Sequence, residues 1–191
     1  MLAVIMCSGL SKRMGQNKLL MTLSGKIIVE YVIENVIKSD FDEVIMIYGD
    51  DKLKNIADKY DIQAIHNPLR EKGQSEAIKL AVRNAGIHSG ISFFMGDQPL
   101  LRTETINLLL NEFCKTKKNI IMPTYNGVVG APVIFPLSLS EEFLKLEGDV
   151  GGKAVINSNV ELISKIEIKD VRESMDIDNK EDLEKLEKVL G

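Results

Sequence analysis

The sequence has few cysteines and histidines and no long apolar run. Its two cysteines, Cys7 and Cys114, are far apart and lack CxxC spacing, so they give neither a disulfide framework nor a zinc site. We interpret them as thiols in a reducing compartment. No stretch approaches the ~18 apolar residues of a membrane span. Basic residues follow the short N-terminal apolar run, whereas they precede that run in a signal peptide. These absences predict a cytoplasmic protein that contacts no membrane.

An excess of basic residues is also lacking. The net charge is −4, with 24 Lys and Arg against 28 Asp and Glu. A general nucleic-acid binder needs a basic face, so we expect no nucleic-acid partner. Hydrophobic residues make up 45% and charged residues 27%, a balance typical of globular proteins. A length of 191 residues suits one domain.

Short apolar runs alternate with segments of helical spacing over the first two thirds of the chain. The runs predict strands at Leu2–Cys7, Val44–Tyr48, Ile62–Ile65, Ile91–Met95 and Ile120–Met122. Between them, one predicted helix carries Ile28, Val32 and Val36 on one face, and a later one begins with Thr103 as N-cap. Such βαβ units predict an α/β fold with a mainly parallel sheet covered on both faces.

The pattern changes after about residue 123. Val128–Phe135 predicts an irregular or antiparallel excursion, and Val160–Ile163 and Ile166–Ile168 predict short strands. Lys180–Leu190 predicts a closing helix. No linker, repeat or low-complexity tract interrupts the chain, so we predict a single domain over residues 1–191.

A basic glycine loop, Gly9–Lys18, follows the first predicted strand. It contains three cations, Lys12, Arg13 and Lys18, and no acid. Ligands of open α/β sheets bind beyond the carboxyl ends of the strands, where this loop must lie. Exposed amides with these cations suit a polyphosphate. GxGxxG is absent, and so is Walker A, because Gln16 rather than Lys follows Gly15. On the loop alone, a basic surface loop without function stays an equal alternative.

Six segments together resemble the MobA-like nucleotidyltransferases. The loop reads MCSGLSKRMGQNK, similar to the family motif LAAGxSxRMGxxK. Further matches in the expected order are NP…GQSEAI at Asn67–Ile78, GDQPLL at Gly96–Leu101, GVVGAPVIF at Gly127–Phe135, GDVGGK at Gly148–Lys153 and DIDNKEDL at Asp176–Leu183. Within the family, the chain looks most like the molybdenum cofactor cytidylyltransferases.

This resemblance implies a Rossmann-like three-layer fold and Mg²⁺-dependent transfer of CMP from CTP to molybdopterin, with release of pyrophosphate. It implies catalytic roles for Arg13, Lys18 and Asp97, and Mg²⁺ binding by Asp97 and Asp178. The implied nucleotide-binding residues are Ser8, Gly9, Arg13, Lys18, Asn67, Gly73 and Ser75. The implied acceptor-binding residues are Gly130, Pro132, Asp149 and Lys153. A molybdoenzyme or its chaperone is a further implied partner.

Some positions depart from the family pattern, including Met21, which stands where proline is common. Cys7 and Ser8 stand where two alanines are usual; both are small, so a nucleotide base can still approach. Guanylyltransferases of the family typically carry glycine at the position of Ser8, which favours CTP here. Ala131 occupies a place often held by His or Asn on the acceptor side, so a different phosphorylated acceptor stays an alternative.

The residues themselves support metal-assisted phosphoryl chemistry. Asp97 follows the strand Ile91–Met95 and should lie at the same sheet edge as the basic loop, and Mg²⁺ prefers carboxylate and phosphate oxygens. A phosphate acceptor is largely dianionic at neutral pH, since its second pKa is about 6, so no general base is required. Both aspartates have a structural alternative to metal binding. Asp97 could form an Asx turn, and Asp178 could be the N-cap of the last helix with Glu181 as its capping-box partner. Asp176 is a rival metal ligand.

Two further positions have structural alternatives. Ser75 could cap a helix beginning at Glu76, and Lys153 could be a surface lysine. At the level of the whole protein, we weigh three hypotheses. The first is transfer of CMP to molybdopterin. The second is transfer of GMP to molybdopterin, or of CMP to another small phosphate. The third is a non-catalytic accessory protein that delivers the cofactor to a molybdoenzyme.

Overall fold

A large mixed β-sheet forms the centre of the molecule. The computed structural model describes residues 1–11 and 15–190. Its eight-stranded sheet has the order β10-β7-β9-β6-β1-β4-β5, with β8 paired to β7. The strands are β1 (Leu2–Cys7), β4 (Glu43–Tyr48), β5 (Gln63–His66), β6 (Gly90–Met95), β7 (Ile120–Tyr125), β8 (Val128–Val129), β9 (Val133–Pro136) and β10 (Ile163–Ile168).

The sheet is mainly parallel, as predicted. β1 pairs in parallel with β4 and β6, β4 with β5, and β7 with β10. The exceptions are β9, antiparallel to β6 and β7, and the short β8, antiparallel to β7. The predicted antiparallel excursion at Val128–Phe135 is therefore confirmed. The carboxyl ends of β1, β4, β5 and β6 lie along one edge, where the loops that follow them meet.

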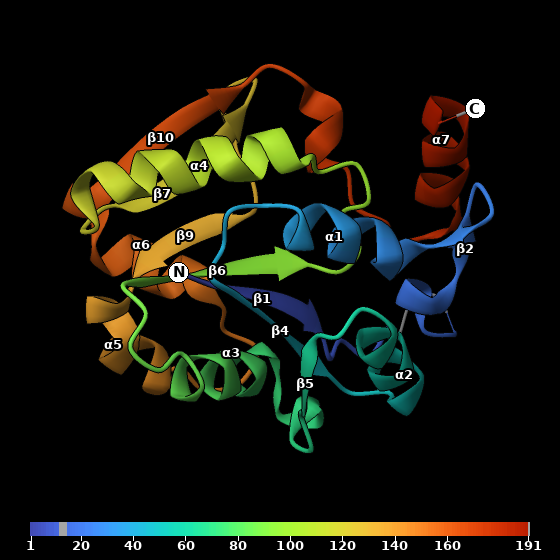
Figure 1. Cartoon of the computed structure of the whole chain (residues 1–191), viewed down its shortest axis with the longest axis horizontal. Coiled ribbons are helices and arrows are strands. Elements are labelled where there is room, and N and C mark those ends of the chain that lie inside the picture. Colours follow the sequence, from blue (N-terminus) through green and yellow to red (C-terminus); the bar gives the residue numbers. More distant parts are fainter. Residues whose placement is uncertain (12–14, 191) are drawn as a thin grey trace.

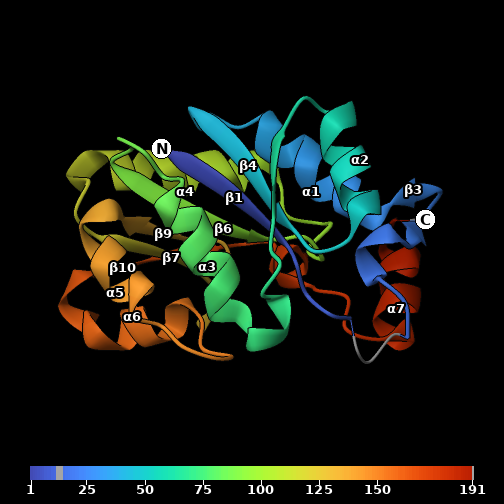
Figure 2. The ribbon, with the colours of Figure 1, turned by 90° about the horizontal axis from the view of Figure 1, so that it is seen from below.

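Helices cover both faces of the sheet (Figures 1 and 2). One face is covered by α1 (Ile28–Ile37), α2 (Asp51–Lys59) and α4 (Thr103–Thr116), and the other by α3 (Gln74–Arg83), α5 (Ser140–Leu144) and α6 (Gly152–Ser158). Alternating strand positions supply the two cores. Val4 of β1 packs with α3 and α5, whereas Ile5 packs with α1 and α2. This is the predicted three-layer α/β architecture.

A small outer unit sits beside the sheet edge at which the loops meet. The two-stranded β2 (Thr22–Leu23) and β3 (Lys26–Ile27) pack with α7 (Lys180–Leu190) at one end of the molecule (Figure 1). Leu23, Ile28, Ile177 and Leu186 are fully buried there. This packing holds the chain segment just before α7 against the loop after β6. Among the described residues, no helix is long and apolar enough to cross a membrane.

Two local predictions were wrong. Thr103 is the first residue of α4 rather than its N-cap, and its hydroxyl donates instead to the Asn35 carbonyl at 3.0 Å. Val160–Leu162 forms a 3₁₀ turn, and the strand runs unbroken from Ile163 to Ile168. The 3₁₀ turn begins after Asn159, whose side chain donates to the Val155 carbonyl at the end of α6 and ties the chain to that helix.

Candidate active site

The loop after β1 is anchored at both ends. The Lys18 N–H donates to the Ser11 hydroxyl at 3.3 Å and closes the loop on itself. The Asn17 amide donates to Asp50 at 3.3 Å, and Asp50 is the N-cap of α2. The Asn17 side-chain oxygen also accepts from the Leu19 N–H at 3.2 Å and so caps the 3₁₀ turn Lys18–Leu20. These contacts fix the point from which the Lys18 side chain leaves the backbone.

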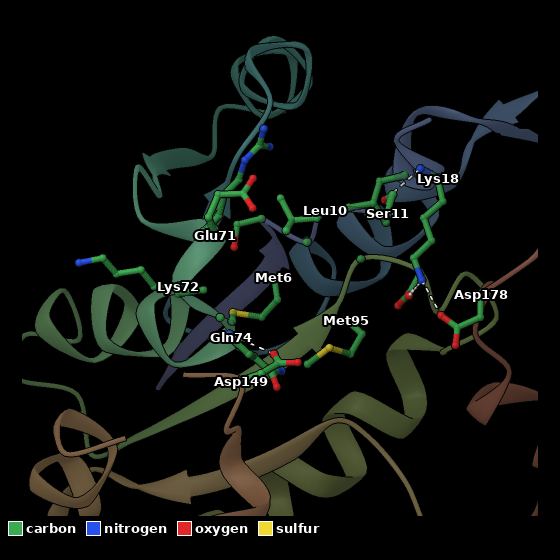
Figure 3. A pocket seen from close by; sticks show the side chains of 18 residues that line it. Met6, Leu10, Ser11, Lys18, Glu71, Lys72, Gln74, Met95, Asp149 and Asp178 are labelled. Carbon is green, nitrogen blue, oxygen red and sulfur yellow. Dashed lines mark hydrogen bonds and ion pairs between the residues drawn. The ribbon is translucent and has the colours of Figure 1, made fainter. Parts of the chain in front are cut away.

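The Lys18 ammonium bridges two carboxylates at the carboxyl edge of the sheet (Figure 3). Its Nζ lies 2.5 Å from Asp97 Oδ2 and 2.9 Å from Asp178 Oδ1. Burial of this ammonium lowers its pKa, but the charge of Asp97 and the hydrogen bonds to both carboxylates outweigh that effect and raise the pKa above its ordinary value. Lys18 is therefore a fixed cation at neutral pH. Lys18, which was predicted to bind phosphate, thus contacts Asp97 and Asp178, which were predicted to bind the metal.

Asp178 reaches Asp97 through the backbone of its neighbour. The Ile177 N–H donates to the Asp97 carbonyl at 3.2 Å, and the buried Ile177 side chain packs beneath α7. The cap of α7 is made by other residues: Asn179 accepts from the Asp182 N–H at 3.0 Å, and Asp182 accepts from the N–H groups of Asp178 and Asn179. The capping pair predicted as the alternative, Asp178 with Glu181, was wrong. The Asp178 carboxylate therefore faces Lys18.

Gly96, just before Asp97, leaves little room for a side chain. A Cβ on Gly96 would lie 3.0 Å from the Cys7 sulfur and 3.2 Å from a Leu19 methyl carbon. Cys7 is buried at the end of β1, and its burial, with the charge of Asp97, raises the pKa of its thiol. Cys7 is thus a neutral packing residue beneath the acidic pair, and not a nucleophile.

Asp176 lies near the two bridged carboxylates but does not join them. Desolvation and the negative charges of Asp97 and Asp178 raise the pKa of Asp176. Among the described residues, no group of three acidic, histidine or cysteine side chains is arranged to hold one metal ion. It is Asp178, and not Asp176, that shares the Lys18 ammonium with Asp97, while the choice of the second metal ligand stays a prediction.

An open cavity of about 700 Å³ lies along this sheet edge. Of the predicted site residues, those in its wall are Ser8, Gly9, Lys18, Gly73, Asp97, Asp149 and Asp178. Figure 3 shows the Lys18 pair with Asp178 at one side and Asp149 with Gln74 at another, with Met6 and Met95 between them. This volume suits a ligand of nucleotide size.

The GDVGGK segment docks on the N-terminus of α3. The Ser75 N–H donates to the Gly148 carbonyl at 3.2 Å, and the Gln74 N–H donates to the Asp149 carboxylate at 3.3 Å. Gly73 has φ of +109°, and a Cβ there would lie 2.3 Å from the Gly148 carbonyl. Asp149 thus satisfies an amide of α3, a contact that the acceptor-binding prediction did not foresee.

Ser8 is positioned by a buried asparagine after β5. The Asn67 amide donates to the Ser8 hydroxyl at 3.2 Å, and Asn67 is 1% exposed. The Asn67 N–H donates to the Tyr48 carbonyl, and its side-chain oxygen accepts from the Leu69 N–H. The predicted nucleotide residue Asn67 therefore stands behind the wall and orients Ser8, which is in it.

Besides Asn67, four predicted site residues that the structure describes do not line the cavity: Ser75, Gly130, Pro132 and Lys153. Ser75 is fully buried in the first turn of α3, with a hydroxyl that has no hydrogen-bond partner among the described residues, and α3 begins at Gln74 rather than Glu76. Pro132 is buried, Gly130 packs on the Tyr125 ring and Lys153 is exposed on α6. Arg13 lies outside the described residues. The roles of these four residues and of Arg13 stay predictions.

Some wall residues were not predicted from the sequence. Met6 and Met95 are paired neighbours near the carboxyl ends of β1 and β6, and both line the cavity. Their position at the carboxyl ends of two predicted strands was the sequence signal that could have identified them. Arg70 also lines it, with its guanidinium held by the Gly49 carbonyl at 2.5 Å. Gln74, which lies between the predicted residues Gly73 and Ser75, also lines the cavity, whereas Ser75 does not.

The acidic pair fits a hard divalent cation. Two carboxylates converge on one positive charge, the Lys18 ammonium, which stands in for the cation. Mg²⁺ is commonly held by one or two carboxylates together with phosphate oxygens and water. Asp97 and Asp178 are the two carboxylates that would hold such an ion, and they line the open cavity.

The fold and this site together define a nucleotidyltransferase. Residues 3–163 match the MobA-like NTP transferase domain, and the chain belongs to that family. The resemblance seen in the motifs is thus confirmed. The match covers the basic loop, Asp97 and the GDVGGK segment, whereas Asp178 lies beyond it.

Curated relatives carry different nucleotide names. The chain is 31% identical over 134 residues to a probable molybdenum cofactor guanylyltransferase of Natranaerobius thermophilus, covering 65% of this chain and 60% of that protein. It is 27% identical to the molybdenum cofactor cytidylyltransferase of Escherichia coli, covering 69% and 67%. The purine catabolism protein PucB of Bacillus subtilis is 25% identical over 100% of this chain and 98% of its own length.

Solved structures share the fold over nearly the whole chain. A nucleotidyl transferase from Methanothermobacter superimposes with a TM-score of 0.84 at 19% identity, over 98% of this chain and 96% of that one. A Mycobacterium tuberculosis protein in complex with manganese gives 0.78 at 20% identity, over 98% and 97%. At these identities the likeness establishes the fold alone.

Proposed function

We propose that the protein transfers CMP from CTP to the terminal phosphate of molybdopterin, with Mg²⁺, and releases pyrophosphate. The observation that carries the proposal is the convergence of Asp97 and Asp178 on one cation beside the loop Ser8–Ser11. This arrangement at one edge of a single cavity supports metal binding by the two carboxylates and phosphate binding by the loop. The eight-stranded sheet, whose strands come from both halves of the chain, also supports our proposal that residues 1–191 act as one domain.

The reaction needs charge neutralisation and alignment rather than a covalent intermediate. An oxygen of the acceptor phosphate forms a bond to the α-phosphorus, the bond from that phosphorus to the bridging oxygen breaks, and pyrophosphate leaves with the electron pair. Lys18 and the loop amides would neutralise the triphosphate, and Arg13 is proposed to assist. Bound Mg²⁺, held by Asp97 and Asp178, would supply further neutralisation of phosphate charge. The dianionic acceptor needs no general base, and neither His66 nor His88 lines the cavity.

Ser8 supports cytosine as the base. Its hydroxyl is oriented by Asn67 and stands in the cavity wall at the place where guanylyltransferases of the family carry glycine. A side chain here reduces the space for a purine. Guanylyl transfer is the second candidate, because the relative from Natranaerobius thermophilus bears that name. Thermal-shift titrations with Mg²⁺ should show stronger stabilisation by CTP than by GTP; the reverse order would overturn the choice of base.

Few of the residues proposed to bind the acceptor line the cavity, so its identity has the least structural support. Molybdopterin follows from the names of the relatives from Natranaerobius and Escherichia coli. Gly130, Pro132 and Lys153 are proposed to contact it, with Asp149 nearby, and Ala131 leaves room for another small phosphate. A molybdoenzyme or its chaperone is the proposed recipient of the product. Family membership favours an enzyme over the accessory protein without catalysis.

The direct test measures pyrophosphate. The protein is incubated with Mg²⁺, molybdopterin and each of the four nucleoside triphosphates in turn. We expect pyrophosphate release with CTP, and none when molybdopterin is omitted. Absence of release with all four would contradict nucleotide transfer to this acceptor. Release with CTP and a sugar or polyol phosphate, but not with molybdopterin, would instead support the alternative acceptor.

A further inference from the structure

The position of Lys18 conflicts with the role that the proposed function gives it. Its ammonium lies within 2.9 Å of both Asp97 and Asp178 and therefore fills the space between the carboxylates. A Mg²⁺ ion held by the same two side chains would stand in that space, since Mg²⁺ sits only about 2.1 Å from its oxygen ligands. Two cations cannot share it, because their repulsion at such a distance is large.

Lys18 has an alternative place within reach. Its backbone is fixed by the 3₁₀ turn and by the hydrogen bond to Ser11, whereas the ammonium is carried on a flexible four-carbon stem. The side chain is 17% exposed and lies in the cavity wall together with Gly9 and Ser11. A polyphosphate bound along that loop would offer the ammonium anionic oxygens in exchange for the two carboxylates.

We propose that Lys18 is a competing cation for the metal site. Without nucleotide, its ammonium neutralises Asp97 and Asp178 and weakens metal binding there. A bound triphosphate draws the ammonium onto its phosphates and so removes the competing charge from the space between the carboxylates, where Mg²⁺ would bind. Metal and nucleotide then favour each other's binding, because the coupling between two ligands is reciprocal. The inference rests on the proposed function for the identity of the phosphate ligand.

The test measures metal binding without nucleotide. Mn²⁺, which is visible by electron paramagnetic resonance, is titrated into the wild-type chain, Lys18→Met and a matched control, Lys26→Met. Lys26 pairs with Glu34 at 2.7 Å, is also partly buried and lies outside the cavity wall. We expect Lys18→Met to bind Mn²⁺ about tenfold more tightly or better, since a like charge next to an ionic site changes its affinity by one or more powers of ten. Lys26→Met should match the wild type.

A double variant tests whether the added Mn²⁺ binds at Asp97. Adding Asp97→Asn to Lys18→Met should abolish the gain in Mn²⁺ affinity, because it removes one of the two proposed metal ligands. The competition is contradicted if Lys18→Met binds Mn²⁺ no more tightly than the wild type, or if the gain persists in the double variant.

A second measurement needs no substitution and covers the case in which Lys18→Met does not fold. Lysines of the wild-type chain are acylated with and without Mn²⁺, and modified peptides are quantified by mass spectrometry. Mn²⁺ should accelerate acylation of Lys18 several-fold and leave Lys26 unchanged; an unchanged Lys18 rate would overturn the proposal. Neither measurement uses turnover. Tighter Mn²⁺ binding with no pyrophosphate release would refute the proposed function alone, whereas turnover without the affinity gain would refute the competition alone.

Discussion

The backbone N–H of Ile177 donates a hydrogen bond to the carbonyl of Asp97 at 3.2 Å. This bond joins the segment before α7 to the loop after β6. It sets Asp178 beside Asp97, so that both carboxylates meet the Lys18 ammonium. Burial of the Ile177 side chain under α7 keeps the bond in place. Packing at the outer end of the molecule thereby determines the geometry of the acidic pair.

Replacement of Asp97 should abolish activity. Asp97→Asn keeps the shape of the side chain but removes the charge that pairs with Lys18 and is proposed to bind Mg²⁺. We expect the rate of pyrophosphate release to fall about 10²-fold or more, the scale of losing a main electrostatic contact in a transition state. Asp51→Asn, at an exposed position on α2 outside the cavity, is the control and should keep wild-type activity. Unchanged turnover in Asp97→Asn would refute the metal assignment.

Gly96 and Cys7 should show coupled effects. Gly96→Ala brings a Cβ to 3.0 Å from the Cys7 sulfur, so either the neighbouring side chains or the loop carrying Asp97 must give by a few tenths of an ångström. We expect a marked fall in activity. Cys7→Ala alone should cost about 1 kcal/mol of stability through a small cavity. In the double variant the smaller side chain makes room, so activity should recover in part. Strictly additive losses in this cycle, measured by pyrophosphate release, would contradict the packing account.

Gly73 and Gly86 offer a matched pair at positive φ. Gly73 has φ of +109° and close contacts with Gly148, whereas Gly86 has φ of +55° and open space around it. Gly86→Ala should cost about 1 kcal/mol, the ordinary penalty of a left-handed alanine. Gly73→Ala should cost at least about 2 kcal/mol more, because only glycine readily adopts that conformation and the added carbon clashes. Urea unfolding gives both free energies; equal costs would show that the GDVGGK segment is not held against α3.

Ser8 should influence base preference. Ser8→Gly removes the hydroxyl that accepts from Asn67 and opens the wall beside the loop. We expect the ratio of kcat/KM for CTP over GTP to fall about tenfold, the scale on which a small change in pocket shape discriminates substrates. Ser138→Gly, an exposed serine elsewhere, should leave the ratio unchanged. A ratio unaffected by Ser8→Gly would mean that another part of the wall selects the base.

Acid should weaken one ion-pair cluster far from the cavity. Hydrogen bonds from the Arg172 guanidinium, and from its backbone, lower the pKa of Asp170 to about 2. Because the folded-state pKa is depressed, the stabilisation is complete above the unfolded value of about 3.9 and is lost as the pH falls towards 2. Asp170→Asn should therefore destabilise the protein at pH 7, by about 1 kcal/mol for a partly exposed pair. In urea unfolding, the difference from wild type should shrink steadily between about pH 4 and pH 2 and vanish only below the folded-state pKa; a constant difference would contradict the pKa shift.

The fold was predictable from the sequence because its signals are local. Buried parallel strands are continuous apolar runs, and β1 at Leu2–Cys7 and α7 at Lys180–Leu190 have the predicted bounds. The placement of Lys18 and Asp97 at one edge followed from strand order. What could not be predicted depends on contacts distant in sequence. The Asp149 contact with the N-terminus of α3 and the burial of Ser75 arise from packing between segments, to which periodicity gives no clue.

The central claim is nucleotide transfer, and the mass of the product tests it most directly. Molybdopterin is incubated with the protein, Mg²⁺ and an equimolar mixture of CTP and GTP, and the products are separated and weighed by mass spectrometry. The account predicts that molybdopterin gains the mass of one CMP unit and that one pyrophosphate appears for each molecule modified. Recovery of unmodified molybdopterin with intact triphosphates would contradict it.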